Sequence, residues 1–193
     1  LVSSMILKNI IDCISVLERD TFSDAWSRDS IEDTLKQDYN VVYSYFLDDK
    51  GYSVYRISKE QDILVYSKPY DGEWTIKLIS WEDFNVCDAT NDGAVDTLPG
   101  RFGGYIIASL IGDETELHRI AVVNDLRGKH IGTNLLDFYM EDADECNRYF
   151  LEVRESNSIA RALYEKQGYD ELAIRKNYYS NPVENAVIYE YQA

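Results

Sequence analysis

The chain has 193 residues, of which 45% are hydrophobic and 13% aromatic, so it is long enough to bury the core of one globular domain and is not a disordered segment. Acidic residues outnumber basic ones by 35 to 19, and the resulting charge of −16 argues against binding to nucleic acid or anionic membranes. The acidity favours a basic partner, unless it only confers solubility, and three separated cysteines with two histidines argue against a disulfide framework or a metal site.

The first part of the chain alternates helix and strand signals. Apolar residues near helical spacing predict an amphipathic helix over 5–20, and Ser27 or Asp29 is the expected cap of a second helix. Residues 40–57 predict a β-hairpin around a turn of Asp, Asp, Lys and Gly, and the pattern predicts two further strands within 63–68 and 73–81. Residues 83–103 are rich in Asp, Asn and Gly and predict a surface loop.

From residue 104 onward the pattern is that of an α/β sheet. The predicted order is strand, strand, helix, strand, helix, strand, strand, and the first helix begins within the stretch 126–136 and continues beyond it. Ser156 is the expected cap of the second helix and Gly168 its end. We expect no membrane-spanning segment and a soluble, cytoplasmic protein.

Residues 127–133, "RGKHIGT", have the composition of a phosphate-binding loop at the start of a helix. A helix N-terminus offers unpaired N–H groups and partial positive charge, and glycines let a phosphate approach the backbone. Residues suited to these tasks are Gly128, Gly132, Arg127, Lys129 and Thr133. His130 stands where a second glycine of the loop would be most natural. Taken alone, the stretch is equally typical of an ordinary surface turn, and it matches neither the Walker nor the dinucleotide motif.

Three stretches around this loop carry a resemblance to a known family. They are "HRIAVVNDLRGKHIGTNLL" at 118–136, "LEVRESNSIARALYEKQGY" at 151–169 and "RKNYY" at 175–179, with "LERDTFSDAWS" at 17–27 as a weaker match. They resemble the GNAT superfamily of acetyl-CoA-dependent N-acetyltransferases, and within it the ribosomal-protein-alanine (RimI-type) branch. The loop pattern R/Q-x-x-G-x-G/A is met by Arg127 and Gly132 and broken by His130. The resemblance covers roughly residues 8–48 and 103–191.

The resemblance implies the fold and the cofactor. The fold would be a single GNAT domain over 1–193, with a mixed, V-shaped central sheet whose splayed parallel strands hold acetyl-CoA and release CoA. The cofactor's pyrophosphate would bind the loop residues Arg127, Gly128, Lys129, His130, Ile131, Gly132 and Thr133. Its pantetheine arm would pair with Ile120, Ala121 and Val122, and a backbone N–H near Val122 would polarise the thioester. Asn157 matches a cofactor-contacting asparagine, although it could equally cap a helix.

The resemblance also implies catalytic roles. Glu152 matches a strand glutamate that acts as general base, and Tyr164 matches a helix tyrosine that protonates the leaving thiolate. Tyr178 and Tyr179 match aromatic residues that line the peptide entrance. A Cβ atom at His130 need not block the cofactor if the backbone there is helical and the side chain points outward, and the imidazole could instead donate a hydrogen bond to the pyrophosphate. From the residues alone, Glu152 could be a solvated strand residue, and each of these tyrosines a packing residue.

Two questions stay open at this level. Residues 49–102 have no counterpart in the compact family pattern, and this β-rich insertion could extend the sheet, cover the acceptor site or form a partner surface. The branch acetylates the N-terminal alanine of a ribosomal protein, and such a basic substrate would suit an acidic enzyme, which we expect to be a monomer or weak dimer. A lysine or a small polyamine remains an alternative acceptor. A binding module without efficient catalysis is the alternative function.

Overall fold

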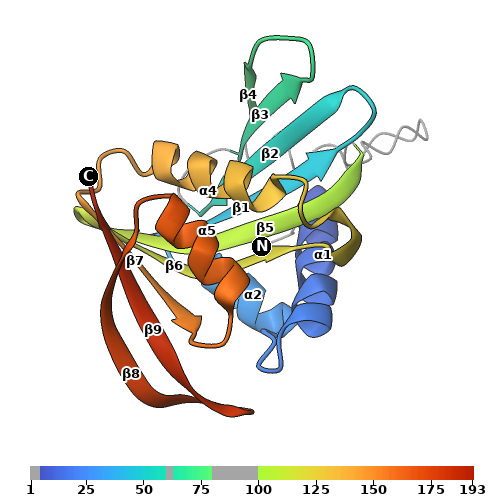
Figure 1. Cartoon of the computed structure of the whole chain (residues 1–193). Coiled ribbons are helices and arrows are strands. Elements are labelled where there is room, and N and C mark those ends of the chain that lie inside the picture. Colours follow the sequence, from blue (N-terminus) through green and yellow to red (C-terminus); the bar gives the residue numbers. More distant parts are fainter. Residues whose placement is uncertain (1–4, 60–62, 80–99) are drawn as a thin grey trace.

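Two helices precede the first strand in the computed structural model, which describes residues 5–59, 63–79 and 100–193 (Figure 1). The predicted first helix is confirmed as α1 (Met5–Thr21), and it buries an isoleucine face that includes Ile10 and Ile14. The second is α2 (Arg28–Thr34), and Ser27 is its cap because its hydroxyl accepts the Ser30 N–H at 3.1 Å. None of the helices in the described ranges is long and apolar enough to span a membrane.

The described strands form one mixed sheet. They are β1 (Asn40–Leu47), β2 (Gly51–Ser58), β3 (Ile63–Pro69), β4 (Thr75–Ile79), β5 (Arg101–Ile111), β6 (Glu114–Val122), β7 (Arg148–Arg154), β8 (Asp170–Ser180) and β9 (Val183–Gln192). Their order across the sheet is β4-β3-β2-β1-β5-β6-β7-β9-β8, and only β6 and β7 run parallel. The connection between these two strands contains α4 (Ile131–Asp142), and α5 (Ser158–Lys166) follows β7. The predicted order of the C-terminal half is therefore confirmed.

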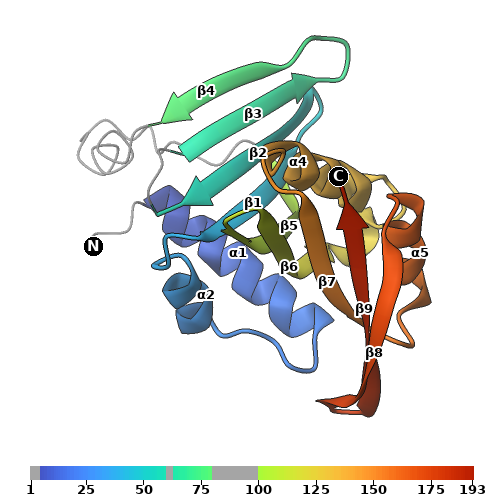
Figure 2. The ribbon, with the colours of Figure 1, turned by 90° about the vertical axis from the view of Figure 1, so that its left-hand side faces the viewer.

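The sheet separates two hydrophobic cores. Helices α1 and α2 cover one face, while α4 and α5 cover the other (Figure 2). Alternation along β7 decides which side chains enter which core, because Leu151 and Val153 are buried under α4 and α5. Glu152 and Arg154 consequently point to the face that carries α1. The same alternation was expected from the sequence.

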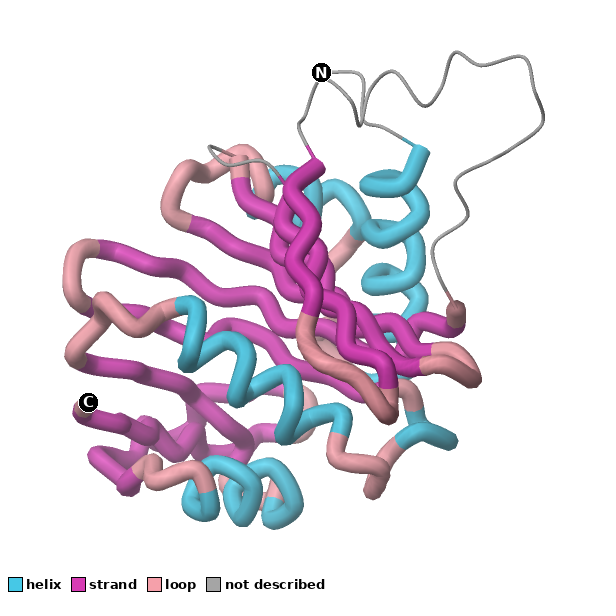
Figure 3. The backbone as a smooth tube through the Cα atoms, turned by 90° about the horizontal axis from the view of Figure 1, so that it is seen from above, coloured by secondary structure: helices cyan, strands magenta, loops and turns pink. Residues whose placement is uncertain are grey.

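The insertion extends the sheet beyond β1. Strands β2 to β4 pair in succession on that side, and the β3–β4 hairpin lies against α4 (Figure 3). The contact is aromatic, because the rings of Tyr66 and Trp74 each lie 5.0 Å from that of Phe138 on α4. Of the three roles considered for the insertion, the described part therefore has the first. The predicted loop at 83–103 lies mostly outside the described residues, and β5 begins at Arg101, within the end of that loop.

Candidate active site

The two parallel strands separate after four residue pairs. Pairing between β6 and β7 runs from Glu114 with Arg148 to Leu117 with Leu151, and there it ends. A bulge at His118 follows, because Leu117 pairs with Ala108 and Arg119 with Ile107 on the neighbouring β5. Strand β6 stays paired with β5 as far as Val122. No described strand pairs with its other edge over Ile120, Ala121 and Val122, so this backbone is open to a ligand, as the V-shaped sheet predicted.

The loop after β6 turns the chain into α4 through two left-handed residues. Arg127 is extended, Gly128 has φ +75°, and His130 is the N-cap of α4 with φ +62° and ψ +9°. The condition of right-handed helical dihedrals, under which a Cβ atom at His130 would leave the cofactor room, is therefore not met. Within three residues the backbone must pass from an extended conformation into a helix, and it does so through left-handed conformations that usually favour glycine. The His130 side chain does not cap the helix, so it leaves the first N–H groups of α4 available to an anion.

The start of α4 lies beside the open strand and α5. A methyl group at Gly132 would lie 3.6 Å from Leu163 and 3.7 Å from Val122, which are ordinary contact distances. Packing among the described residues therefore does not require a glycine at this position, while close approach of a ligand to the backbone would. Arg127 donates from Nε to the carbonyl of Val122 at 3.1 Å and so ties the loop to the end of β6. The loop, including Lys129, Ile131 and Thr133, thus borders the gap that opens between β6 and β7.

Helix α5 contributes Tyr164 and Asn157. Tyr164 is 3% exposed, and its ring lies among those of Tyr169 and Tyr189. Burial raises its pKa well above the ordinary tyrosine value, with the nearby Tyr179 as a second cause. Asn157, and not Ser156 as expected, caps the helix, because its Oδ1 accepts the Ala160 N–H at 3.2 Å. The end of the helix at Gly168, with φ +89°, is as predicted.

Glu152 lies on the opposite face of the sheet from Tyr164, beside the point where β7 leaves β6. Its carboxylate is bound by Nη1 of Arg175 at 2.8 Å, and 19% of its side chain is exposed. Burial, and then this carboxylate, raise the pKa of Tyr178, whose ring lies 4.8 Å from the Arg175 guanidinium. Glu152 is therefore an oriented carboxylate in a small cluster and not a freely solvated residue.

Tyr179 interacts electrostatically with both predicted catalytic residues. Burial and the Glu152 carboxylate raise its pKa to about 12, and Tyr179 in turn contributes to the raised pKa of Tyr164. The Arg154 guanidinium lies 4.1 Å from its ring centre. The β8–β9 pairing is irregular at Asn177, which has φ +51°, and the register of β8 shifts between Arg175 and Tyr179. The structure thus brings Glu152, Tyr178 and Tyr179 together on one side of the gap.

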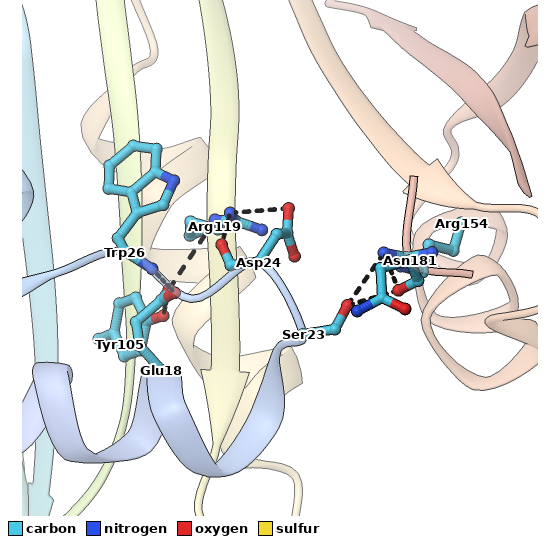
Figure 4. A network of polar contacts seen from close by, with 8 residues as sticks. All are labelled: Glu18, Ser23, Asp24, Trp26, Tyr105, Arg119, Arg154 and Asn181. Atoms are coloured by element: carbon cyan, nitrogen blue, oxygen red, sulfur yellow. Dashed lines mark hydrogen bonds and ion pairs between the residues drawn. The ribbon is translucent and has the colours of Figure 1, made fainter. Parts of the chain in front are cut away.

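A polar network joins this cluster to the turn between α1 and α2 (Figure 4). Arg119, on the open part of β6, donates to the carbonyl of Asp24 at 3.0 Å and lies near the buried Glu18. Ser23 donates to the carbonyl of Asn181 at 2.8 Å, in the turn between β8 and β9. Sequence reasoning missed these contacts because they join segments far apart in the chain; only the "LERDTFSDAWS" match pointed to this turn.

Together, these features describe an α/β fold in which two parallel strands open to admit an elongated, phosphate-bearing ligand beside a carboxylate and a buried tyrosine. A model of the acetyltransferase (GNAT) family matches residues 14–169, so the chain belongs to this family.

Known relatives agree with this assignment. The chain is 36% identical over 85 residues to the ribosomal protein bS18-alanine N-acetyltransferase of Escherichia coli, which covers 43% of this chain and 57% of that protein. It is 43% identical over 90 residues to the enzyme of the same name from Haemophilus influenzae, over 44% and 61% of the two chains. The match thus spans about three-fifths of the length of these curated relatives.

Solved structures show the same fold. The crystal structure of the ribosomal-protein-S18-alanine N-acetyltransferase from Escherichia coli has a TM-score of 0.60 at 20% identity, covering 98% of this chain and 91% of that one. Ard1 from Thermoplasma volcanium has a TM-score of 0.62 at 17% identity, over 96% and 92%. At such identities the likeness shows the fold alone, and the acceptor must be argued from the site.

Proposed function

We propose that the protein is an acetyl-CoA-dependent N-acetyltransferase that acts on the N-terminal α-amino group of a basic protein. The observation that carries this proposal is the placement of Glu152 and Tyr164 on opposite faces of one gap between parallel strands. A base on one side and an acid on the other suit a transfer in which the acceptor and the acetyl donor enter from different faces.

The residues around the gap fit acetyl-CoA. The open edge of β6 at Ile120 to Val122 offers N–H and C=O groups to an extended arm, and the uncapped start of α4 offers N–H groups to a pyrophosphate. A Cβ atom at Gly128 would meet no described atom within 4 Å, so the described residues leave space beside the loop at that position. When bound, the cofactor supplies an activated acetyl thioester. Asn157 would contact it through the amide nitrogen, since the cap uses only the amide oxygen.

Tyr164 is suited to hold a proton in the gap. Its raised pKa keeps the phenol protonated at neutral pH, and a phenol can deliver that proton to a thiolate whose conjugate thiol has a pKa near 8.5. Within the described ranges no hydrogen bond of its hydroxyl is found, so no described residue competes for this proton. Tyr164 is therefore the proposed general acid.

Glu152 is suited to accept a proton from an ammonium group on the other face. A peptide α-amino group has a pKa of roughly 7.7–8.0, against about 10.4 for lysine, so it needs only modest help from a carboxylate, directly or through a water molecule. The Arg175 contact orients this carboxylate, and Tyr178 and Tyr179 lie beside it as walls for the acceptor. Glu152 is therefore the proposed general base.

The acceptor class follows from charge and from the named relatives. A chain with a net charge of −16 attracts basic proteins, and the curated relatives are named for the alanine of ribosomal protein bS18. We therefore propose an alanine-initiated, basic protein N-terminus as the acceptor. A peptide array that varies the first residue tests this, because indifference to that residue would contradict it.

Titration calorimetry with acetyl-CoA separates an enzyme from a binding module that only shares the fold. We expect saturable binding with a dissociation constant well below about 1 mM, in the range of ordinary substrate affinities. An absence of binding at millimolar acetyl-CoA would contradict the proposal as a whole.

A further inference from the structure

A buried carboxylate on α1 anchors the turn that follows this helix. Glu18 is fully buried and accepts the backbone N–H of Trp26 at 2.7 Å, while the hydroxyl of Tyr105 on β5 also donates to it. The guanidinium Nε of Arg119 lies 3.9 Å from the same carboxylate (Figure 4). One carboxylate thus holds the helix, the sheet and the far end of the turn together.

Arg119 holds the same turn from the side of the gap. Its Nη2 donates to the carbonyl of Asp24 at 3.0 Å and to the Asp24 carboxylate at 3.2 Å. Its guanidinium also lies 4.8 Å from the ring centre of Phe22 and 5.3 Å from that of Trp26. Because Arg119 belongs to the part of β6 that has left β7, it joins the turn directly to the wall of the gap.

The turn is also linked to the acceptor cluster, which consists of Glu152, Tyr178 and Tyr179. The Ser23 hydroxyl donates to the carbonyl of Asn181, and Nη2 of Arg154 donates to the same hydroxyl and to the same carbonyl, each at 3.3 Å. That guanidinium lies against the ring of Tyr179, beside Glu152. A continuous set of contacts therefore runs from Glu18 through Arg119 and the turn to Tyr179.

Stability alone does not explain the buried pair. Nε of Arg119 is buried without a hydrogen-bond partner, and 3.9 Å is too long for a hydrogen bond to Glu18. Burying an ion pair usually costs more than the attraction returns unless the hydrogen bonds of both groups are complete, and those of Arg119 are not. Such local costs are typical of functional sites. The contacts of the pair instead converge on the turn.

We propose that Glu18 and Arg119 are positioning residues, which fix the turn at 22–26 so that Ser23 and Arg154 hold Tyr179 at the entry of the acceptor. This inference rests on the proposed acetyl transfer, because Tyr179 matters to the acceptor only if that reaction takes place. It assigns the pair to acceptor binding and not to cofactor binding or to the chemical step.

The test replaces the pair without leaving a buried charge. In the double variant Glu18→Gln/Arg119→Met, glutamine keeps an oxygen for the Trp26 N–H and methionine keeps an apolar stem. With a short alanine-initiated, arginine-rich peptide, we expect KM for the peptide to rise about tenfold or more, while kcat and the Kd for acetyl-CoA stay within about twofold. A role in stability alone would change the melting temperature and leave KM as it was.

A second buried ion pair offers a matched control. Arg56 and Asp142 lie 2.6 Å apart, are buried to a similar degree and connect β2 to the end of α4, away from the acceptor cluster. The double variant Arg56→Met/Asp142→Asn is expected to change the melting temperature and to leave the peptide KM within about twofold. A third variant, Ser23→Ala, removes the two hydrogen bonds that join the turn to Arg154 and to the Asn181 carbonyl, and is expected to raise the peptide KM about threefold or more.

Two results would overturn the positioning role. One is a peptide KM for the Glu18→Gln/Arg119→Met variant within about twofold of the parent value, and the other is an equal rise in the control pair. A parent protein that binds acetyl-CoA yet acetylates no peptide would instead refute the proposed function, and this inference with it. An active parent with an unchanged double variant refutes the positioning role only.

Discussion

Replacing His130 by glycine is expected to keep or improve binding of acetyl-CoA. At φ +62° a residue with a Cβ atom pays roughly 1–2 kcal/mol for its left-handed conformation, which glycine avoids. Glycine also makes the unfolded chain more flexible, which lowers the stability by about 0.4–1 kcal/mol. The net gain in stability therefore lies between roughly 0 and 1.5 kcal/mol. The imidazole makes no hydrogen bond to the start of α4, and its removal therefore breaks no cap.

The assay combines thermal unfolding with titration calorimetry of acetyl-CoA. We expect a melting temperature unchanged or raised by up to about 6 °C, and a Kd equal to the parent value or lower by up to about tenfold. His130→Ala separates imidazole from backbone, because it keeps the Cβ atom and should show no gain. Gly128→Ala, at φ +75° in open space, introduces the opposite change and should cost about 1 kcal/mol. A tenfold loss of affinity in both His130 variants would refute the reasoning and make the imidazole a cofactor ligand.

Two other variants test the roles assigned in the gap, and a further two test the cap of α5. Tyr164→Phe should lower kcat by about 100-fold or more with the Kd for acetyl-CoA nearly unchanged, and an unchanged kcat would remove Tyr164 as the acid. Tyr164 must be protonated to act as the acid, and its pKa is raised. If deprotonation of Tyr164 lowers kcat of the parent protein at high pH, the decrease should therefore begin above about pH 10. Glu152→Gln should lower kcat/KM at pH 7 by about 100-fold and recover part of it near pH 9, where an α-amino group has lost its proton unaided; a flat pH response would contradict a base. Asn157→Ala should lower the stability by about 1 kcal/mol in thermal unfolding, and Ser156→Ala by much less, whereas equal losses would contradict the observed cap.

The fold follows from local patterns that the sequence shows directly. The spacing of apolar residues in 5–20 predicts the observed helix, and the alternation in β7 predicts the observed faces of that strand. Both patterns depend only on residues close together in the chain. The parallel pair and its early separation came from the family resemblance, and the structure confirms them. For the insertion, the sequence predicted strands but not their contact with Phe138, because that contact joins residues far apart in the chain.

The sequence suggested which residues to consider for the site, but it did not show the contacts among them. The dihedrals of His130 depend on how the chain enters α4 in three dimensions, so the sequence did not show the left-handed conformation observed there. The ion pair of Glu152 with Arg175 crosses β9, and the irregularity at Asn177 shifts the register of β8, which no alternation pattern shows. The catalytic and binding roles remain predictions, and variants must test them.

The most direct test of the central claim is mass spectrometry of peptides incubated with the protein and acetyl-CoA. The peptides would be an alanine-initiated basic sequence with one internal lysine and the same sequence with its α-amino group blocked. The account predicts acetylation of the first peptide at its α-amino group and none of the blocked one. Acetylation of the internal lysine in both peptides, or no transfer to either, would contradict it.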